Sequence, residues 1–463
     1  MAKRQPTFGE ALCTVVILCT VIFFTVVLYD ASPHIPMLIG CALASVVALR
    51  AGYRWEEIQQ GMVEGVIQAL EAMMILMLVG VLIGVWIEAG VVPSMIYYGL
   101  KLLSPRFFLV TAMLICSFIS MVVGSWGTAG TIGLAFMGIA HAMGIPLGLA
   151  AGAIISGSYV GDKLSPLSDT TNLASAVTGV NVFDNVRRMF PVAGSVYLLA
   201  AGIFLCIGLQ YQDHSGETLR SIDTLTGQLA DQFWISPLGF LPLIILLACI
   251  LLRLPSVPSI FIGILSAAVL GVLVQDTSVQ QMMFASFSGH VSETGNEMLD
   301  QLLTAGGMES MMYSVSMILT AMMFGGIMEK TGQMSVLMAP LMKRIRSARS
   351  LIFVTLITCF SVNLILPEQY ISIALPGRMY TEEYRRMGVD QRDLTVALGA
   401  GGAATSVLVP WNTCGVFMSG VLGVGSFAYL PFAFFNLLMP LAAVVYALVR
   451  YRHARYTATK SAA

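Results

Sequence analysis

Charged residues are scarce in this chain. Only 11% of its 463 residues are Asp, Glu, Lys or Arg, whereas soluble domains carry about 25%. Hydrophobic residues make up 57% of the chain, and the mean hydropathy is +0.84. This composition predicts an all-α polytopic membrane protein in contact with membrane lipid. The formal net charge of −1 argues against a nucleic-acid partner.

The chain also lacks the short motifs of metal centres and intramembrane proteases. Its eight cysteines form no CxxC pair, and no HExxH sequence occurs. None of the four Ser-Gly pairs completes a GxSG motif, and Tyr159-Val160-Gly161-Asp162 lacks the first glycine of GxGD. We therefore expect no enzymatic activity and no cofactor.

Apolar runs long enough to cross a membrane, which takes about 20 residues, are abundant. Ordinary spans are expected over residues 11–29, 35–49, 66–88, 190–210, 234–252, 255–275, 308–328 and 431–449. We expect an interfacial helix at 91–103, a loop at 211–232 and an amphipathic segment at 276–302. We divide the chain into five parts: N-terminal scaffold helices (residues 1–60), a first repeat (61–210), loops with two linking scaffold helices (211–300), a second repeat (301–450) and a cytoplasmic tail (451–463).

Two apolar segments are interrupted near their middle. Residues 107–141 are broken by Gly124-Ser125-Trp126-Gly127-Thr128, and residues 351–380 by Pro367-Glu368-Gln369. Each arm is short for a span, so we interpret both segments as re-entrant hairpins with tips near mid-membrane. Non-helical backbone is tolerated there when protein surrounds it. Two ordinary short spans are the alternative for 107–141.

Two further spans are broken by a proline. The break lies at Pro166 in residues 145–171 and at Pro410 in residues 394–413. Proline cannot donate a backbone hydrogen bond and biases the preceding residue away from helix. A charged, broken segment is costly in hydrocarbon, so residues 157–172 are predicted to line a buried or watered cavity and to form an ion site. The alternative is a loop outside the membrane.

The two halves of the chain match at a nearly fixed offset. Gly144, Gly157, Pro166, Gly179 and Phe183 each have an identical residue 244 positions later. With the N-terminus in the cytoplasm and both hairpins re-entering, 20 of the 24 Lys and Arg residues are cytoplasmic and 3 are outside, while Lys163 lies in the broken span. This bias follows the positive-inside rule and inverts one half relative to the other. The sequence thus predicts an inverted-repeat secondary transporter with two re-entrant hairpins and two proline-broken transmembrane helices, and with both termini cytoplasmic.

Oxygen-bearing side chains around the first proline offer ligands for a small cation. Asp162 and Asp169 are seven positions apart, and the break at Pro166 could bring them closer around one cation. Two neighbouring carboxylates titrate as a coupled pair, so one site could hold either sodium or protons. Neutral oxygens could come from Ser165, Ser168, Thr170, Thr171, Asn172, Ser125 and Thr128. The alternative for each Ser and Thr is a hydroxyl that bonds to the helix backbone.

Other polar residues are accessory candidates. Lys163 could pair with either aspartate or hold the empty site neutral. Glu71 is either a proton-relay acid or a hydrated interfacial carboxylate, and Glu368 is a weaker candidate at the second hairpin tip. Side chains for a larger cargo could come from Gln369, Asn412 and Thr413.

The run Gly161-Asp162-Lys163-Leu164-Ser165-Pro166-Leu167-Ser168-Asp169-Thr170-Thr171-Asn172 resembles the signature of the NhaC-type sodium/proton antiporter family. Gly124-Ser125-Trp126-Gly127-Thr128 resembles that family's preceding motif, and the resemblance covers roughly residues 10–450. It implies a secondary transporter of the ion-transporter superfamily with a scaffold and a mobile transport domain, usually a homodimer, in the bacterial inner (cell) membrane. The second half keeps Pro410 but has no acid where Asp162 and Asp169 stand, which argues against a second, symmetric cation site.

The resemblance implies sodium/proton exchange by alternating access. We expect an elevator-like motion in which the hairpins and broken helices move past scaffold spans in 11–49 and 234–275. The family also contains malate/lactate exchangers and amino-acid transporters, so a sodium- or proton-coupled exchanger of a small organic acid or amino acid is the alternative. A cation channel would instead place symmetric subunits around a pore.

Overall fold

The computed structural model describes residues 4–29, 32–211, 217–252, 254–293, 299–300 and 303–451. Within these residues the regular structure is helical, apart from one isolated β-bridge between His290 and Ala305. The predicted all-α class is therefore confirmed. Arg253 and the tail from residue 452 onward, which contribute to the predicted charge bias, lie outside the described residues.

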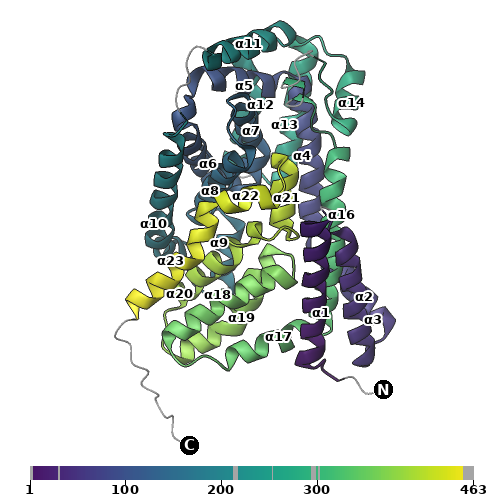
Figure 1. Cartoon of the computed structure of the whole chain (residues 1–463), viewed down its shortest axis with the longest axis vertical. Helices are drawn as coiled ribbons and strands as arrows, with labels where there is room; N and C mark the ends of the chain where they lie inside the picture. The colour runs from purple at the N-terminus through teal and green to yellow at the C-terminus, as the bar shows by residue number, and fades with distance from the viewer. Residues whose placement is uncertain are drawn as a thin grey trace, which may run out of the picture.

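The N-terminal helices and α16 form one side of the molecule (Figure 1). They are α1 (Phe8–Ile22), the π-helix η1 (Phe23–Leu28), α2 (His34–Arg50), α3 (Trp55–Gln68), α4 (Leu70–Glu88) and α16 (Met312–Lys330). Glycines permit the backbones of α3 and α16 to touch, because a Cβ on Gly326 would lie 2.0 Å from the Gly61 carbonyl oxygen. The predicted span 66–88 begins instead at Leu70, since Ala69 separates α3 from α4.

The first interrupted segment folds into a helical hairpin. It comprises α6 (Pro105–Thr128), the π-helix η2 (Ala129–Gly133) and α7 (Leu134–Ala142). The chain turns within α6 at Gly124, whose φ of 77° and ψ of 171° are non-helical and favour glycine. The rings of Phe108 and Phe136 lie 5.9 Å apart, whereas 28 residues of straight helix would separate them by about 42 Å. The two arms therefore lie side by side.

The first proline-broken span follows as α8 (Leu147–Lys163) and α9 (Asp169–Thr178). We call residues 162–169, from the end of α8 to the first residue of α9, the first break. Two glycines let α8 pack directly on α6, because a Cβ would lie 2.3 Å from the Met113 carbonyl oxygen at Gly157 and 2.1 Å from that of Ser117 at Gly161. This close packing holds the first break against the first hairpin.

The connecting part of the chain differs from the sequence-based expectation. Its helices are α5 (Val91–Leu102), α10 (Val182–Gly208), α11 (Glu217–Gln232), η3 (Pro237–Phe240), α12 (Leu241–Leu251), α13 (Ser256–Val274) and α14 (Val279–Ser288). The loop expected at 211–232 is largely the helix α11, which lies across the top of Figure 1 and buries Leu225 and Leu229. These leucines are four positions apart and share one helix face, so a mostly polar helix can still cover an apolar surface. The expected interfacial helix is α5, whose residues are mostly buried.

The second half contains the matching hairpin and break. Its helices are η4 (Glu309–Met311), α17 (Gln333–Met342), α18 (Ala348–Ile365), α19 (Gln369–Arg386), α20 (Gln391–Leu398), η5 (Gly399–Ala403), η6 (Ser406–Leu408), α21 (Thr413–Leu422), α22 (Ser426–Tyr429), η7 (Leu430–Phe432) and α23 (Phe434–Arg450). Helices α18 and α19 pack against each other and form the second hairpin, with its tip at residues 366–368. Residues 406–413, at the offset of 244 from the first break, form the second break, where the helix axis bends by 48°.

Backbone geometry repeats between the halves. Gly144 and Gly388 have φ values of 68° and 64°, and Gly179 and Gly423 have values of 72° and 66°. These pairs are 244 positions apart, and both members of the second pair end the helix that follows a break. Ser168 and Asn412, also 244 apart, are the N-caps of those two helices. The sequence match is therefore also a match of local structure.

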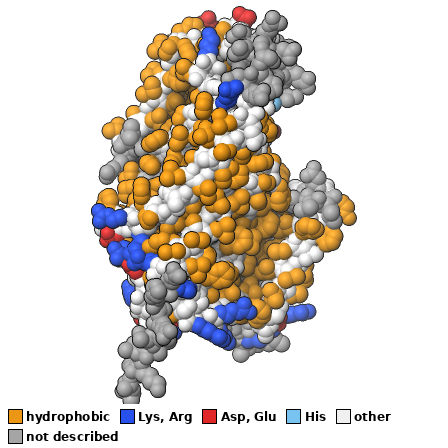
Figure 2. All heavy atoms as spheres, turned by 60° about the vertical axis from the view of Figure 1, so that its left-hand side comes forward, with side chains coloured by type: hydrophobic (Ala, Val, Ile, Leu, Met, Phe, Trp, Pro, Cys, Tyr) orange, Lys and Arg blue, Asp and Glu red, His pale blue; other side chains and the backbone are white. Residues whose placement is uncertain are grey.

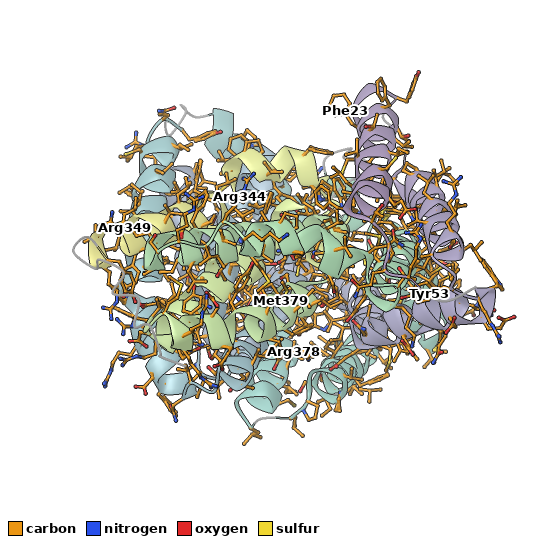
Figure 3. The ribbon with its side chains drawn as sticks, turned by 90° about the horizontal axis from the view of Figure 1, so that it is seen from below. Phe23, Tyr53, Arg344, Arg349, Arg378 and Met379 are labelled. Atoms are coloured by element: carbon orange, nitrogen blue, oxygen red, sulfur yellow. The ribbon has the colours of Figure 1, made fainter. Side chains whose placement is uncertain are left out.

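The outer surface suits a lipid environment. Five helices in the described part are long and apolar enough to cross a membrane, and up to nine segments qualify if each bent pair is one span. Hydrophobic side chains cover most of the face in Figure 2, while Lys and Arg gather mainly toward its lower end. Seen from that end, Arg344, Arg349 and Arg378 are spread over the lower surface (Figure 3). The fold is that of a multi-pass membrane protein.

Candidate ion site

The first break follows directly from its sequence. Pro166 has no N–H to continue the ladder of α8, and Leu167 N–H donates instead to the hydroxyl of Ser165 at 3.1 Å. The Ser165 hydroxyl in turn donates to the carbonyl of Met121 on α6, which ties the break to the first hairpin. Ser168 then caps α9 by accepting from Thr171 N–H at 3.4 Å. As a result, Asp169 is the first residue of a new helix.

A buried ion pair stands at the end of α8. Lys163 Nζ lies 2.7 Å from Asp162 Oδ2, and their side chains are only 2% and 7% exposed. Lys163 also donates to Thr170 Oγ1 at 2.6 Å, and the Thr170 hydroxyl lies 3.1 Å from the same Asp162 oxygen. Ser168 Oγ extends this cluster at 3.1 Å from Thr170 Oγ1. Thus Asp162 is already neutralised by its neighbour within the protein.

Asp169 is different from Asp162. Its side chain is exposed to the cavity and forms neither a hydrogen bond nor an ion pair with any residue that the structure describes. Asp162 and Glu71 both repel it electrostatically. An unpaired carboxylate at the start of a helix, next to a second carboxylate, is suited to receive a cation or a proton.

Both aspartates face one cavity of 430 Å³. The first tip contributes Ser125 and Trp126, and the second hairpin contributes Gln369 and Tyr370. The opposite wall is apolar and comes from helices α4, α12 and α13 and the segment between the last two: Ile75, Val79, Leu82, Leu246, Leu254, Pro255 and Ile260. The cavity therefore lies between the hairpin and break segments on one side and α4, α12 and α13 on the other; of these, α12 and α13 fall in the segment expected to be scaffold.

The structure brings together only part of the predicted oxygen set. Asp162, Ser168, Asp169, Thr170 and Ser125 line the cavity. The other four do not line it, and their side chains bond to backbone carbonyls: Ser165 to Met121, Thr128 to Gly124, Thr171 to Asp162 and Asn172 to Pro166 and Ser168. Hydroxyl groups in helices often satisfy backbone carbonyls in this way.

The accessory candidates separate in the same manner. Gln369 lines the cavity, and its amide nitrogen donates to the Ala403 carbonyl at 2.9 Å. Asn412 caps α21 and donates to the side chain of Asn363 at 3.1 Å, while Thr413 N–H donates to the Pro367 carbonyl at 2.9 Å. These contacts dock the second tip on the second break. Glu71 lies on α4 with an exposed side chain, outside the cavity lining.

Several contributing residues were not predicted from the sequence. Trp126 and Tyr370 provide aromatic walls from equivalent positions of the two hairpins, 244 residues apart, and Trp126 stacks on Phe417 at 4.2 Å. Asn363 accepts from the Asn412 amide in the second break and donates to the Gly402 carbonyl and the Thr405 hydroxyl just before it. A polar residue inside an apolar run was the available signal for Asn363. For Trp126 and Tyr370, the signal was that aligning the two tips at the offset of 244 places one aromatic residue opposite the other.

The described part of the chain contains no cluster of three or more His, Cys, Asp or Glu side chains that could hold a metal ion. A cation bound between the two aspartates would therefore need hydroxyl, carbonyl or water oxygens to complete its shell. Such mixed oxygen sets suit hard monovalent and divalent cations rather than transition metals.

Comparisons with known proteins point to one family. The model of the Na+/H+ antiporter family matches residues 157–450, which include both breaks. The chain is 34% identical to the Na+/H+ antiporter NhaC of Bacillus subtilis over 97% of this chain and 99% of that protein. It is 36% identical to the malate-2H+/Na+-lactate antiporter of the same organism, over 96% and 95%. It is 34% identical to the arginine/ornithine antiporter ArcD of Halobacterium salinarum, over 96% and 92%. The predicted family is thereby confirmed: this chain belongs to the Na+/H+ antiporter family.

Proposed function

We propose that this protein exchanges sodium for protons across the membrane by alternating access. The observation that carries the proposal is the unpaired carboxylate of Asp169, which shares a cavity with Asp162 and with the hydroxyls of Ser125, Ser168 and Thr170. NhaC proteins of this family, by their names, exchange the same ions. Sodium would be the cargo, held by both aspartates and these hydroxyls.

Lys163 gives the exchange its charge balance. Because Lys163 neutralises Asp162, the site carries one net negative charge, on Asp169. One sodium ion or one proton cancels that charge, so the two ions compete for a single site. When sodium binds, Asp162 can turn from Lys163 toward the ion, while Thr170 keeps its hydrogen bond to the lysine. The neutral, loaded site can then cross the low-dielectric barrier at lower cost than a charged one.

Alternating access would follow from the inverted repeat. In this proposal the hairpins are re-entrant, and α6–α9 and α18–α21 form the mobile transport domain. Helices α1, α2, α12 and α13 belong to a static, dimerising scaffold, and we assign α4, which packs on α13, to the same static group. The cavity between these two groups is where such a motion would open. The abundance of Arg at the lower end supports placing that end, with both termini, in the cytoplasm of a bacterial inner (cell) membrane.

A second candidate is a sodium- or proton-coupled exchanger of a small organic acid or amino acid. The cavity favours it by its size, because 430 Å³ exceeds the space of one ion, given about 30 Å³ per water molecule. Two relatives are named for organic cargo. However, no Lys or Arg side chain among the described residues lines the cavity, which leaves an organic anion without a positive partner. Sodium/proton exchange is therefore the better supported function.

Transport by purified protein in proteoliposomes tests the proposal. An imposed sodium gradient should drive proton movement, reported by a trapped pH indicator, without any organic substrate. Lactate, malate, arginine and ornithine, each tested separately as labelled cargo with and without sodium, should not be carried. If proton movement does not depend on sodium and one of these solutes is taken up, the proposal is wrong and the second candidate function is supported.

A cross-link tests the moving-domain part. A Cβ on Gly130 would lie 3.3 Å from the side chain of Val79, across the cavity boundary. In a cysteine-free background, a complete disulfide between Val79→Cys and Gly130→Cys should stop exchange, and reduction should restore it. The matched control pairs Gly133→Cys with Ile154→Cys, where a Cβ would lie 3.1 Å from Ile154 within the same group. Full turnover with the first cross-link would favour a gate limited to the hairpin tips.

A further inference from the structure

Glu368 is a buried carboxylate that the ion site does not use. It lies at the tip of the second hairpin, its residue is 5% exposed, and it does not line the cavity. Its side chain accepts from Ile371 N–H at 2.9 Å, and it faces the N–H groups of Gln369 and Tyr370. It forms no ion pair with any described residue, in contrast to Asp162. A negative charge here would be held by backbone dipoles alone.

Among the residues that the structure describes, no Lys, Arg or His forms an ion pair with Glu368. Tyr370 on its own helix and Cys414 on α21 are titratable groups that interact with Glu368, and neither is a cation. Asp162 and Asp169 act on Tyr370 from across the cavity, and both are acidic. Burying a carboxylate without a cation is costly, and taking up a proton removes that cost.

Helix capping alone does not explain an acid at this position. The helices that follow the two breaks are capped by the neutral residues Ser168 and Asn412, which are equally buried. Asn412 accepts from Cys414 N–H at 3.1 Å without any charge. A glutamate at the tip therefore adds something beyond a hydrogen-bond acceptor, namely the capacity to bind a proton.

The internal repeat gives the position its meaning. Glu368 matches Gly124 of the first tip at the offset of 244, and a Cβ on Gly124 would lie 3.9 Å from an Asp162 carboxylate oxygen. The second break carries Ser406 and Thr413 where the first carries Asp162 and Asp169. The second tip contacts that break directly, since Thr413 N–H donates to the Pro367 carbonyl. Each half thus has a carboxylate where its hairpin tip meets its break. In the first half this carboxylate is Asp162, on the break; in the second half it is Glu368, on the tip.

We propose that Glu368 is a proton-binding carboxyl of the transport cycle, separate from the sodium-binding aspartates. An O–H bond forms on Glu368 with a proton taken from water while the tip is open to one side. The same bond breaks when the tip opens to the other side, which returns the proton to water. The neutral carboxyl is buried under the closed tip only on the step that carries the proton. On the sodium-carrying step the ionised carboxylate is held by the N–H groups of Gln369, Tyr370 and Ile371, so one proton moves in one direction per cycle. This inference rests on the proposed function for its place in the cycle, but its proton binding can be measured without transport.

The decisive experiment counts protons on solubilised, purified full-length protein. In a pH jump from about pH 9 to about pH 6 without sodium, a range in which exposed carboxyls stay ionised, wild type and Glu368→Asp should take up one more proton per chain than Glu368→Gln, which keeps an acceptor oxygen for the cap. In proteoliposomes, the proton-to-sodium ratio from reversal potentials should fall by one in Glu368→Gln and stay unchanged in Glu368→Asp. Glu382→Gln, an exposed acid on the same helix with an 82% exposed side chain, is the matched control and should change neither value.

Equal proton uptake by wild type and Glu368→Gln would overturn the proposal and leave Glu368 as a cap. An equal loss of turnover in Glu368→Gln and Glu368→Asp, with the ratio intact, would do the same. If wild type shows the additional proton but no sodium-driven proton movement, the proposed exchange fails while the assignment of Glu368 stands. The two ideas are thereby tested separately.

Discussion

The two breaks occupy equivalent positions in the repeat but hold opposite chemistry. The first contains a buried ion pair beside an unpaired carboxylate, Asp169, at the cavity. The second is closed by neutral hydrogen bonds among Asn363, Asn412 and the backbone. Both are proline-broken and capped alike. The backbone frame is therefore shared, and under the proposed function the side chains would decide which half binds a cation.

The polar side chains of the second break have more of their hydrogen bonds made within the protein than Asp169 of the first break. A neutral amide network can be completed within the protein, whereas a transport site must leave a ligand free for its ion. In the proposed function Asp169 is that free group. Its counterpart Thr413 is buried, with its N–H bonded to the second tip. The predictions below test whether this asymmetry is functional.

The largest effect is expected from removing either aspartate. Asp162→Asn or Asp169→Asn should reduce sodium-driven proton movement in proteoliposomes to the level of empty vesicles. A contact to a charged group contributes about 1.5–3 kcal/mol, so sodium affinity should fall by at least about tenfold. The control is Thr413→Val in the second break, which should retain exchange. Exchange that survives in both aspartate variants would remove the first break from the mechanism.

The buried ion pair should be the largest stability difference between the breaks. Lys163→Met leaves Asp162 uncompensated and should cost about 3–5 kcal/mol. The double variant Asp162→Asn with Lys163→Met should recover most of this loss. Thermal unfolding in detergent measures both effects. A double variant as unstable as the single one would mean that Lys163 matters through packing rather than charge.

A smaller loss is expected in the neutral network. Asn363→Leu leaves the Asn412 side chain and the Gly402 carbonyl without their partner and should cost about 1–3 kcal/mol. The same melting assay applies, and sodium affinity should stay unchanged in the folded fraction. Reduced sodium affinity would show that the second break belongs to the ion site.

Orientation of the halves can be tested without any energetic change. In a cysteine-free background, Ser215→Cys should react with an impermeant thiol reagent from outside only, and Ser347→Cys from the cytoplasmic side only. Position 215 lies outside the described residues, so this prediction comes from the charge bias. Labelling of position 347 from outside would contradict the inverted arrangement.

The smallest effect concerns the helices that enter the breaks. Asp390 caps α20 and accepts from Arg392 N–H at 2.9 Å, whereas its counterpart Pro146 offers α8 no side-chain cap. Burial raises the pKa of Asp390, but hydrogen bonds from Arg392 and the nearby Arg188 outweigh it and hold the pKa below its ordinary value. Its stabilisation is therefore present above that ordinary value, about pH 4, and is lost as pH falls through the lowered pKa.

Asp390→Ala should accordingly lower stability by about 1 kcal/mol at neutral pH. The difference from wild type should shrink in strong acid, measured by melting at a series of pH values. A constant difference at all pH values would assign the effect to the helix cap geometry alone.

Much of this architecture could be predicted from sequence because its signals are local. Pro166 and Pro410 mark the breaks, glycines mark the tip and the helix ends, and the acids near Pro166 mark the site. What escaped prediction depends on packing. Whether a hydroxyl such as Ser165 or Thr128 faces the cavity or a backbone carbonyl is decided by the neighbouring helix. The helix α11 escaped because its few buried leucines are outnumbered by polar residues.

The central claim is that the charged first break, and not its neutral counterpart, binds the transported cation. Equilibrium binding of radioactive sodium to purified protein tests it most directly. The account predicts sodium binding that protons displace, lost in Asp169→Asn and retained in Thr413→Val. Sodium binding retained in Asp169→Asn and lost in Thr413→Val would place the ion in the other half and contradict the account.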